Sequence, residues 1–414
     1  MGLVAHYKLD GNANDALGRY NGVASNVTWV DGKLGQAGSF NGSSSSVNFN
    51  MNLQMSWSAS FWVKGNGIYP FAFLGQGVHS ARQGLHIQHS TSTNIRFGMF
   101  SNDTDFVVPA LSSTQWTHYV FIYNHGEPYG KRLFRNGVEV TGTPVQTQTS
   151  YLGIGTVRIG ATYSPGTSGA WANGLIDDVR IYDHALSERE VRDLAQGLAL
   201  HYTFDQDSGA VTRDSSTQGN DGVVTGATWV EGGMVGKGCY DFTAASNKVV
   251  FNDNKANYQD GFTISAWVFK RSNGGGTYGR VFDKSTNTSA AGGYYLYVNA
   301  GAAYAFRVGG TTPVISTPAL NLNQWYLLTA TVDAGNVARL YVDGVQVSSG
   351  NNHNLSLITT NNPLTIGNRS NATDRNFDGQ IDDVRIYATA LSADEVREVY
   401  QQRASLDSQG NLLC

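Results

Sequence analysis

The fold is decided by Gly174-Leu175-Ile176-Asp177-Asp178-Val179-Arg180-Ile181-Tyr182, a nine-residue stretch that occurs twice in the chain. It returns at residues 379–387 as Gly-Gln-Ile-Asp-Asp-Val-Arg-Ile-Tyr. Apolar residues that alternate with polar ones predict a β-strand with one buried face. We therefore expect Asp177, Val179 and Ile181 on one side of the strand, and Asp178, Arg180 and Tyr182 on the other. A carboxylate beside a core-facing row is costly to bury, so a metal ion, backbone N–H groups or an arginine should pair with it.

The rest of the chain repeats around this stretch. Both copies open with an alternating segment that ends in aspartate, at residues 3–10 and 198–205. Both contain a short hairpin signal, Asn136-Gly137 in the first copy and Asp343-Gly344 in the second. Each copy closes with a Ser-x-x-Glu capping box and a short helical pattern. Tryptophans recur at matching places and are predicted to lie in the core: Trp29, Trp62, Trp116, Trp229, Trp267 and Trp325.

This repetition predicts an all-β protein made of two tandem antiparallel β-sandwich jelly rolls, each closed by a short helix. The expected boundaries are 1–197 for the first jelly roll and 198–402 for the second. Residues 403–414 form a polar C-terminal tail that belongs to neither repeat.

Composition narrows the possible functions. The net charge is -4 and charged residues make up 14% of the chain, so no basic stripe exists and no nucleic-acid partner is expected. No apolar run reaches the roughly 18 residues that a membrane span needs, so no membrane partner is expected. Cys239 and Cys414 are the only cysteines, which excludes a disulfide framework. The first residues show no basic and apolar leader, so no secretory signal is visible.

Several ordered motifs occur in both repeats, among them Tyr-x-Leu/Phe-Asp, Thr-Trp-Val, Gln-Trp, Leu-Phe/Tyr-x-Asn/Asp-Gly and Ile-Asp-Asp-Val-Arg-Ile-Tyr. In this order they resemble the laminin-G-like jelly-roll domains of the concanavalin-A-like lectin/glucanase superfamily. The resemblance implies two stacked antiparallel sheets, often one structural calcium ion, and roles in glycan binding, adhesion or surface display. It does not name one ligand, because a fold hosts many functions.

The resemblance implies a structural Ca²⁺, and the candidate ligands are Asp10 with Asp177 and Asp205 with Asp382. Ca²⁺ takes six to eight oxygen ligands, which the polar loop after each opening strand could complete with carbonyl groups. If the first and last strands of a repeat are neighbours, each pair of aspartates converges. The second loop carries more acids, which favours the second site. The alternative is that Asp177 and Asp382 cap turns or bind arginines.

Glycan contact needs an aromatic platform with amide, carboxylate or arginine groups beside it. Loop residues of this kind differ between the repeats, and divergent loops on a shared scaffold are where binding tends to occur. The candidates are Arg82, Tyr163 and Trp171 in the first repeat, and Tyr278, Arg280, Arg369 and Asp374 in the second. The alternative is ordinary loop packing, or contact with a neighbouring subunit.

Enzymatic activity is not expected. Glycoside hydrolysis needs two carboxylates about 5 to 9 Å apart. In the glucanases that the chain resembles, they lie along one strand as Glu-x-Asp-x-Glu. The closest string here is Asp394-Glu395-Val396-Arg397-Glu398, which falls on the predicted terminal helix. A glycoside hydrolase-related enzyme is therefore the weakest of the alternatives.

The sequence thus predicts a non-enzymatic surface or adhesion protein that presents glycan- or protein-binding faces. Residues 406–412 are similar to the ends of some phage tail and capsid-surface proteins, and no secretory signal is visible, so a location on the virion surface is expected. The expected partners are a glycan or cell-surface receptor, or other virion proteins within a larger or homo-oligomeric assembly. The alternative is an extracellular protein: a secreted bacterial adhesin or carbohydrate-binding module.

Overall fold

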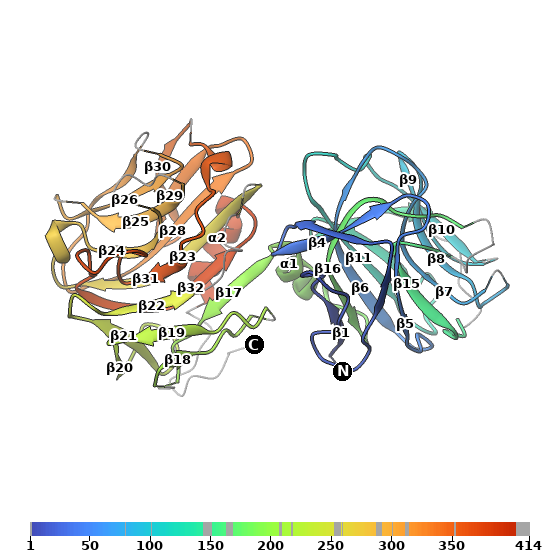
Figure 1. Ribbon diagram of the computed structural model, residues 1–414, viewed down its shortest axis with the longest axis horizontal. Helices are drawn as coiled ribbons and strands as arrows, with labels where there is room; N and C mark the ends of the chain where they lie inside the picture. Colours follow the sequence, from blue (N-terminus) through green and yellow to red (C-terminus); the bar gives the residue numbers. More distant parts are fainter. Residues whose placement is uncertain are drawn as a thin grey trace. The chain divides into compact units, whose positions relative to one another are not determined.

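The chain forms two compact units, Met1–Gln196 and Gly197–Cys414, called unit 1 and unit 2 below (Figure 1). This computed structural model describes residues 2–78, 80–100, 102–143, 151–162, 169–206, 209–216, 218–251, 258, 260–286, 292–299, 301–310, 314–351 and 353–402. The tail at 403–414 and the candidate Tyr163 therefore lie outside the described residues. No helix in the described part of the chain is long and apolar enough to cross a membrane.

Unit 1 consists of two antiparallel sheets. The sheet next to the helix, called the helix-side sheet, contains β1 (Leu3–Tyr7), β3 (Thr28–Asp31), β4 (Gln36–Asn41), β6 (Trp57–Gly65), β11 (Thr117–Tyr123), β12 (Lys131–Arg135), β13 (Val138–Val140) and β16 (Asn173–Tyr182). The other sheet, called the far sheet, contains β2 (Val23–Ser25), β5 (Ser46–Asn50), β7 (Phe71–Gln76), β8 (Leu85–Thr91), β9 (Asn94–Met99), β10 (Asp103–Val107), β14 (Gly142–Thr143) and β15 (Thr156–Ile159).

Unit 2 repeats this arrangement. Its helix-side sheet contains β17 (Leu198–Tyr202), β20 (Thr228–Glu231), β21 (Gly238–Phe242), β23 (Gly261–Lys270), β28 (Trp325–Asp333), β29 (Ala338–Val342), β30 (Val345–Gly350) and β32 (Gly379–Tyr387). Its far sheet contains β18 (Val211–Thr212), β19 (Gly222–Thr225), β22 (Lys248–Phe251), β24 (Arg280–Lys284), β25 (Tyr294–Val298), β26 (Ala303–Val308), β27 (Ile315–Ala319) and β31 (Leu364–Ile366). Two short 3-10 helices, η1 (Gly275–Thr277) and η2 (Leu355–Leu357), lie in its loops. The prediction of two tandem antiparallel sandwiches is confirmed.

The repeated stretch forms a central strand of each helix-side sheet. β16 lies between β6 and β4 and pairs antiparallel with β1, while β32 lies between β23 and β21 and pairs with β17. The opening and closing strands of each unit are therefore neighbours, which is the condition for each pair of candidate aspartates to converge.

The predicted alternation of side chains between the two faces of this strand fails at one place. The pairing of β16 with β6 shifts between Asp177 and Arg180, and Asp178 there has a φ of 48°. The extra residue is a β-bulge, which re-aims the side chains that follow it. As a result, Ile176, Val179 and Ile181 all enter one core, and the prediction that Asp177 lies on the same side as Val179 and Ile181 is wrong. Unit 2 has the same bulge at Asp383, where φ is 45°.

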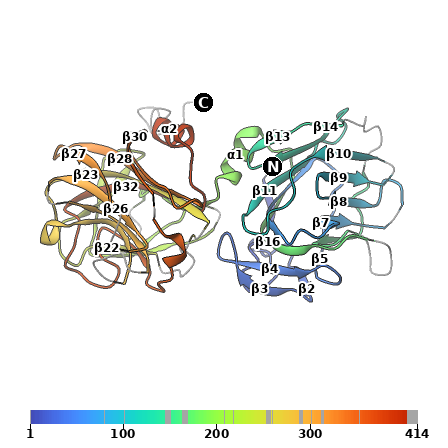
Figure 2. The same cartoon turned by 90° about the horizontal axis from the view of Figure 1, so that it is seen from above.

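A short helix closes each unit and covers its helix-side sheet, α1 (Glu188–Ala195) in unit 1 and α2 (Ala393–Gln401) in unit 2 (Figure 2). Both capping boxes are present, since Ser187 and Ser392 accept from the third residue of the helix and its glutamate reaches back. Val191 of α1 is buried against Val120 and Ile122 of β11. Burial of this apolar stripe, rather than helix propensity, holds so short a helix in place.

The cores lie between the two sheets of each unit and are rich in aromatic residues. In unit 2, Phe262 of the helix-side sheet stacks on Tyr294 of the far sheet with 4.5 Å between ring centroids. Of the predicted core tryptophans, Trp62, Trp116 and Trp267 are buried, and the other three are only half-buried.

Candidate functional site

The acidic pair of unit 1 converges where the opening and closing strands meet. Asp177 is fully buried, and its Oδ2 accepts hydrogen bonds from the backbone N–H groups of Lys33 at 2.7 Å and Leu34 at 2.9 Å. The carboxylate of Asp10 accepts the N–H of Gln36, from the same loop, at 2.7 Å. The Oδ1 atom of Asp177 is buried and has no hydrogen-bond partner among the described residues.

This environment disfavours the ionised form of Asp177 unless a cation lies beside it. Burial raises the pKa of Asp177 well above its usual value, and the charges of Asp178 and Asp10 add to the increase. The orphaned Oδ1 beside Asp10 fits either a cation or a proton. Within the described residues no group of three or more His, Cys, Asp or Glu could hold a metal ion, so Ca²⁺ at this site would need backbone carbonyls and water as further ligands.

The acidic pair of unit 2 is more fully hydrogen-bonded. Asp382 accepts the N–H of Asp383 at 2.8 Å on Oδ1 and the N–H of Val235 at 2.9 Å on Oδ2. Asp205 accepts the N–H of Lys237. Both oxygens of Asp382 therefore already accept a hydrogen bond, whereas Oδ1 of Asp177 in unit 1 accepts none from the described residues.

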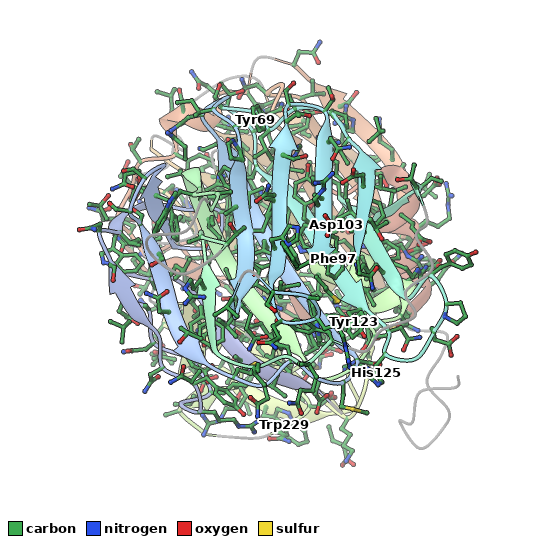
Figure 3. The ribbon with its side chains drawn as sticks, turned by 90° about the vertical axis from the view of Figure 1, so that its right-hand side faces the viewer. Tyr69, Phe97, Asp103, Tyr123, His125 and Trp229 are labelled. Atoms are coloured by element: carbon green, nitrogen blue, oxygen red, sulfur yellow. The ribbon has the colours of Figure 1, made fainter. Side chains whose placement is uncertain are left out.

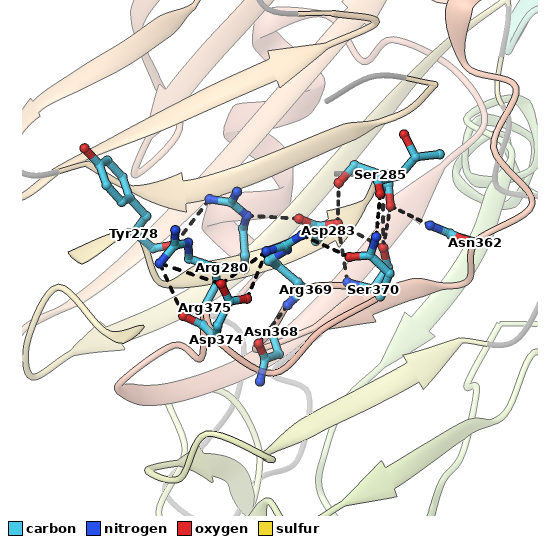
Figure 4. Close-up of polar contacts among 12 residues, drawn as sticks. Tyr278, Arg280, Asp283, Ser285, Asn362, Asn368, Arg369, Ser370, Asp374 and Arg375 are labelled. Atoms are coloured by element: carbon cyan, nitrogen blue, oxygen red, sulfur yellow. Dashed lines mark hydrogen bonds and ion pairs between the residues drawn. The ribbon is translucent and has the colours of Figure 1, made fainter. Parts of the chain in front are cut away.

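The structure brings the four candidates of unit 2 into one cluster at the far sheet, shown in Figure 4. The Nη1 atom of Arg369 binds both carboxylate oxygens of Asp374, at 2.9 and 3.2 Å. The Arg280 guanidinium donates to the backbone oxygen of Tyr278 at 3.2 Å. The guanidinium of Arg375, which the sequence reading missed, lies 5.7 Å from the ring centre of Tyr278. Residues from two separate segments of the chain, 278–280 and 369–375, thus meet here.

The base of this cluster is a buried ion pair. The Nε atom of Arg280 lies 2.9 Å from Asp283, and both side chains are almost completely buried. Burial raises the pKa of Asp283, while Arg280 and the Ser285 hydroxyl counteract the increase. The Arg280 guanidinium also stacks on Tyr295 at 4.0 Å and on Tyr297 at 5.0 Å. Arg280 therefore fixes the cluster from below and is not exposed to a ligand.

The rim of the cluster is accessible. Tyr278 is 39% exposed, and the side chains of Asp374 and Arg375 are 53% and 24% exposed. Three glycines, Gly274 to Gly276, form the loop that holds this rim, and the N–H of Gly275 donates to the backbone oxygen of Asn376 at 2.9 Å. A Cβ on Gly276 would lie 1.7 Å from the Arg375 guanidinium, so a larger residue there would require that side chain to move.

The described candidates of unit 1 lie in two different loops. Arg82 is exposed, with a φ of 66°, and its backbone bonds to Met99 and Leu152. Trp171 is half-buried and pairs through its backbone with Ala161. No interaction between Arg82 and Trp171 is found in the described part of unit 1.

The outward face of the far sheet differs chemically between the units. In unit 2, Asp283, Tyr295 and Arg307 are cross-strand neighbours on β24, β25 and β26. The same ladder in unit 1 holds Gly75, His86 and Gly98. Beyond it on β10, Asp103 and Asp105 pair with Arg96; Asp103 is labelled in Figure 3.

Sequence reasoning missed Asp283, Tyr295, Tyr297 and Arg375. One signal could have found two of them, since Tyr295 and Tyr297 alternate with the core residues Tyr294, Leu296 and Val298. Aromatic residues on the outward positions of a buried strand indicate a covered or binding face.

The family model described as the concanavalin A-like lectin/glucanases superfamily matches the chain twice, at residues 38–192 and 243–397. No curated protein sequence matches the chain.

Several solved structures are similar. Domain 4 of AbnA, an extracellular arabinanase from Geobacillus stearothermophilus solved with arabinotriose, is 24% identical over 47% of this chain and 98% of that chain, with a TM-score of 0.38. The receptor-binding domain of botulinum neurotoxin type G is 17% identical over 50% of this chain and 51% of that chain, with a TM-score of 0.37. Trypanosoma rangeli sialidase in complex with sialic acid is 12% identical over 78% of this chain and 62% of that chain, with a TM-score of 0.42. These TM-scores all lie below 0.5, so family membership is judged on the family model alone.

Proposed function

The chain belongs to the concanavalin A-like lectin/glucanases superfamily, and from this premise we propose that it is a non-enzymatic glycan-binding protein. The observation that carries the proposal is the exposed rim of unit 2, where Tyr278, Arg369, Asp374 and Arg375 meet above a buried ion pair. An aromatic ring offers a flat apolar surface to the C–H face of a sugar, and the charged groups beside it can bind hydroxyl groups.

The arrangement of the rim suits binding because its parts are held in place before a ligand arrives. Arg280 is fixed by Asp283 and by two tyrosine rings, and its guanidinium in turn binds the backbone of Tyr278. A preorganised surface loses little conformational entropy on binding, which improves affinity for a given contact area.

The carboxylates of the cluster support the non-enzymatic part of the proposal. A glycosidase needs one carboxylate as acid and a second as base or nucleophile, both reaching the scissile bond. Asp374 is exposed but bound by Arg369. Asp283 is buried and paired with Arg280, so among the described residues of the cluster Asp374 is the one exposed carboxylate.

The test is a glycan array followed by calorimetry on the full chain. Replacing Tyr278 with alanine should weaken binding about tenfold or more, since a stacked aromatic contact is worth roughly 0.5–1.5 kcal/mol beyond its buried area. Tyr129→Ala is the matched control, because Tyr129 is an exposed tyrosine of unit 1. Reducing ends should not be released from any bound glycan. Binding that survives Tyr278→Ala unchanged, or no binding to any glycan, would contradict the proposal.

We propose in addition that Asp10 and Asp177 hold a structural Ca²⁺. The support is the buried Oδ1 atom of Asp177, which lacks a hydrogen-bond partner among the described residues beside a second acid. Such an ion would supply positive charge between two carboxylates and so remove their repulsion.

We also propose that the protein acts on the surface of a phage particle, as the similarity of residues 406–412 to phage structural proteins suggests. The other virion proteins would then be its partners. Mass spectrometry of purified particles should detect the chain, whereas recovery only from the medium or the cell envelope would support the adhesin alternative.

A further inference from the structure

The rim of unit 2 carries a positive charge that its own acids do not balance. Asp374 lies 2.9 Å from Nη1 of Arg369, which takes both of its oxygens. Arg375 is 3.9 Å from Asp374, beyond hydrogen-bond distance, and otherwise contacts a backbone oxygen at 3.4 Å. With Arg280 and Asp283 paired beneath, two arginines share one aspartate at the surface.

A further arginine adds positive charge on the same face of the far sheet. Arg307 lies opposite Tyr295 on the neighbouring strand, and its charge acts on that tyrosine. Its Nε atom is buried without a hydrogen-bond partner among the described residues. Unit 1 has Gly98 at the equivalent place in the ladder, so Arg307 has no counterpart there.

The guanidinium of Arg375 lies against a glycine loop. Gly276 has a φ of 57°, and a Cβ there would lie 1.7 Å from Nη1 of Arg375 where that side chain now lies. The backbone oxygen of Arg375 accepts the N–H of Arg280 at 2.9 Å, which ties this rim residue to the buried pair. The guanidinium thus lies against the face of Tyr278 while its side chain remains 24% exposed.

We propose that the glycan bound at this rim carries a carboxylate, as uronic and sialic acids do, and that Arg375 binds the carboxylate while the sugar ring packs against Tyr278. This inference rests on the proposed function and names its ligand class. A guanidinium offers two parallel N–H groups that match a carboxylate in one plane, and such charge-assisted bonds are about twice as strong as neutral ones. A sugar is favoured over an acidic peptide because the partly exposed ring of Tyr278 lies directly beside the cation.

The experiment compares acidic sugars with their neutral counterparts on the full chain by calorimetry. The probes are trigalacturonate with its methyl ester, and sialyllactose with lactose; polyglutamate serves as the acidic peptide. At least one acid should bind about tenfold or more tightly than its neutral counterpart, and added salt should weaken that binding.

Arg375→Gln should remove this preference without lowering the melting temperature. The matched control is Arg397→Gln, which removes the same charge from the exposed face of α2 in the same unit. Its acid preference should be unchanged, because Arg397 lies outside the rim.

Each other outcome overturns the inference. If neutral sugars bind as tightly as the acids, if the two arginine variants behave alike, or if polyglutamate binds equally well, the ligand class is wrong while glycan binding survives. If no glycan binds at all, the proposed function fails together with the inference.

Discussion

At the scale of single residues, the adjacent aspartates of each closing strand have opposite electrostatic environments. Burial raises the pKa of Asp382 well above its usual value, and the nearby Asp383 and Asp205 add to this. Burial would also raise the pKa of Asp383, but Arg385 and His201 beside it hold that pKa below its usual value. The bulge separates the two carboxylates, so that one is matched by cations within the chain and the other is not.

The first prediction concerns Asp177, whose pKa is raised in the folded state. Without a cation, the folded chain binds more protons than the unfolded chain above pH ~4, so the free energy of unfolding should fall as pH rises. Bound Ca²⁺ should abolish this loss and stabilise unit 1 by about 2.7 kcal/mol at a hundredfold excess over Kd. Calorimetry between pH 5 and 8, with Ca²⁺ or with chelator, measures both effects.

Asp177→Asn is the informative variant for this prediction. It should lose the response to Ca²⁺ and, in chelator at pH 8, melt above the wild-type protein. If chelator leaves the melting temperature unchanged and elemental analysis finds no metal, a proton neutralises the site and the calcium proposal is wrong.

At the scale of elements, two kinds of interaction join strands β24 and β25 in the cluster of unit 2. One is their backbone hydrogen bonding, and the other is the contact of the Arg280 guanidinium with tyrosine rings. Asp283 on β24 binds Arg280 on the same strand, and Arg280 covers Tyr295 and Tyr297 on β25. Ser370, from the loop after β31, donates to Asp283 at 3.2 Å. A single buried carboxylate therefore orders two strands and the loop that carries the rim.

Asp283→Ala is predicted to destabilise unit 2 by about 3–5 kcal/mol, because it leaves Arg280 as an unpaired buried charge. The control is Asp333→Ala, which removes the partner of Arg339 in a pair that is about one-third exposed and should cost ~1 kcal/mol or less. Urea unfolding measures both. Equal, small effects of the two variants would show that Arg280 does not need Asp283.

At the scale of the whole molecule, two units with one architecture differ in their buried histidines. In unit 1, burial lowers the pKa of His118 to about 3 and that of His89 to about 4. The corresponding residues of unit 2 are Leu327, which faces Trp267 as His118 faces Trp62, and Val298.

We expect unit 1 to be the more sensitive to acid. Because the folded pKa of His118 lies below its unfolded value of 6.5, its stability contribution is complete above pH ~6.5 and is lost as pH falls toward 3. His118 alone should lower the stability of unit 1 by about 3 kcal/mol between pH 7 and pH 4. Scanning calorimetry at pH 4 should show two transitions. Tryptophan fluorescence or limited proteolysis, followed for each unit, should show that unit 1 melts first.

The variant His118→Leu copies the residue of unit 2 and should flatten the pH dependence of unit 1. Unit 2 should be unaffected and serves as the internal control. If both units lose stability in parallel as the pH falls, His118 and His89 are not the cause.

The sequence by itself determined the architecture. Two copies of an alternating pattern, the Asn-Gly and Asp-Gly turns and the two Ser-x-x-Glu boxes predicted the tandem sandwiches and the terminal helices. These features follow from neighbouring residues, since side-chain direction in a strand, turn type and helix capping depend on spacings of a few positions. The sequence also placed Tyr278, Arg369 and Asp374 in loops that differ between the repeats, whereas Arg280, predicted with them, is a buried residue of β24.

Only the tertiary structure decided what those residues contact. Lys33 donates to Asp177 across 144 positions of sequence, and Asp378 reaches Arg271 across 107, distances at which no local pattern reports a partner. The bulge at Asp178 was hidden because one inserted residue breaks the alternation that predicts the strand. Arg375 lies over Tyr278 and beside Gly276, which come from a different part of the chain. The binding chemistry of the rim depends on which loops lie next to each other in space, and that arrangement forms only when the whole unit folds.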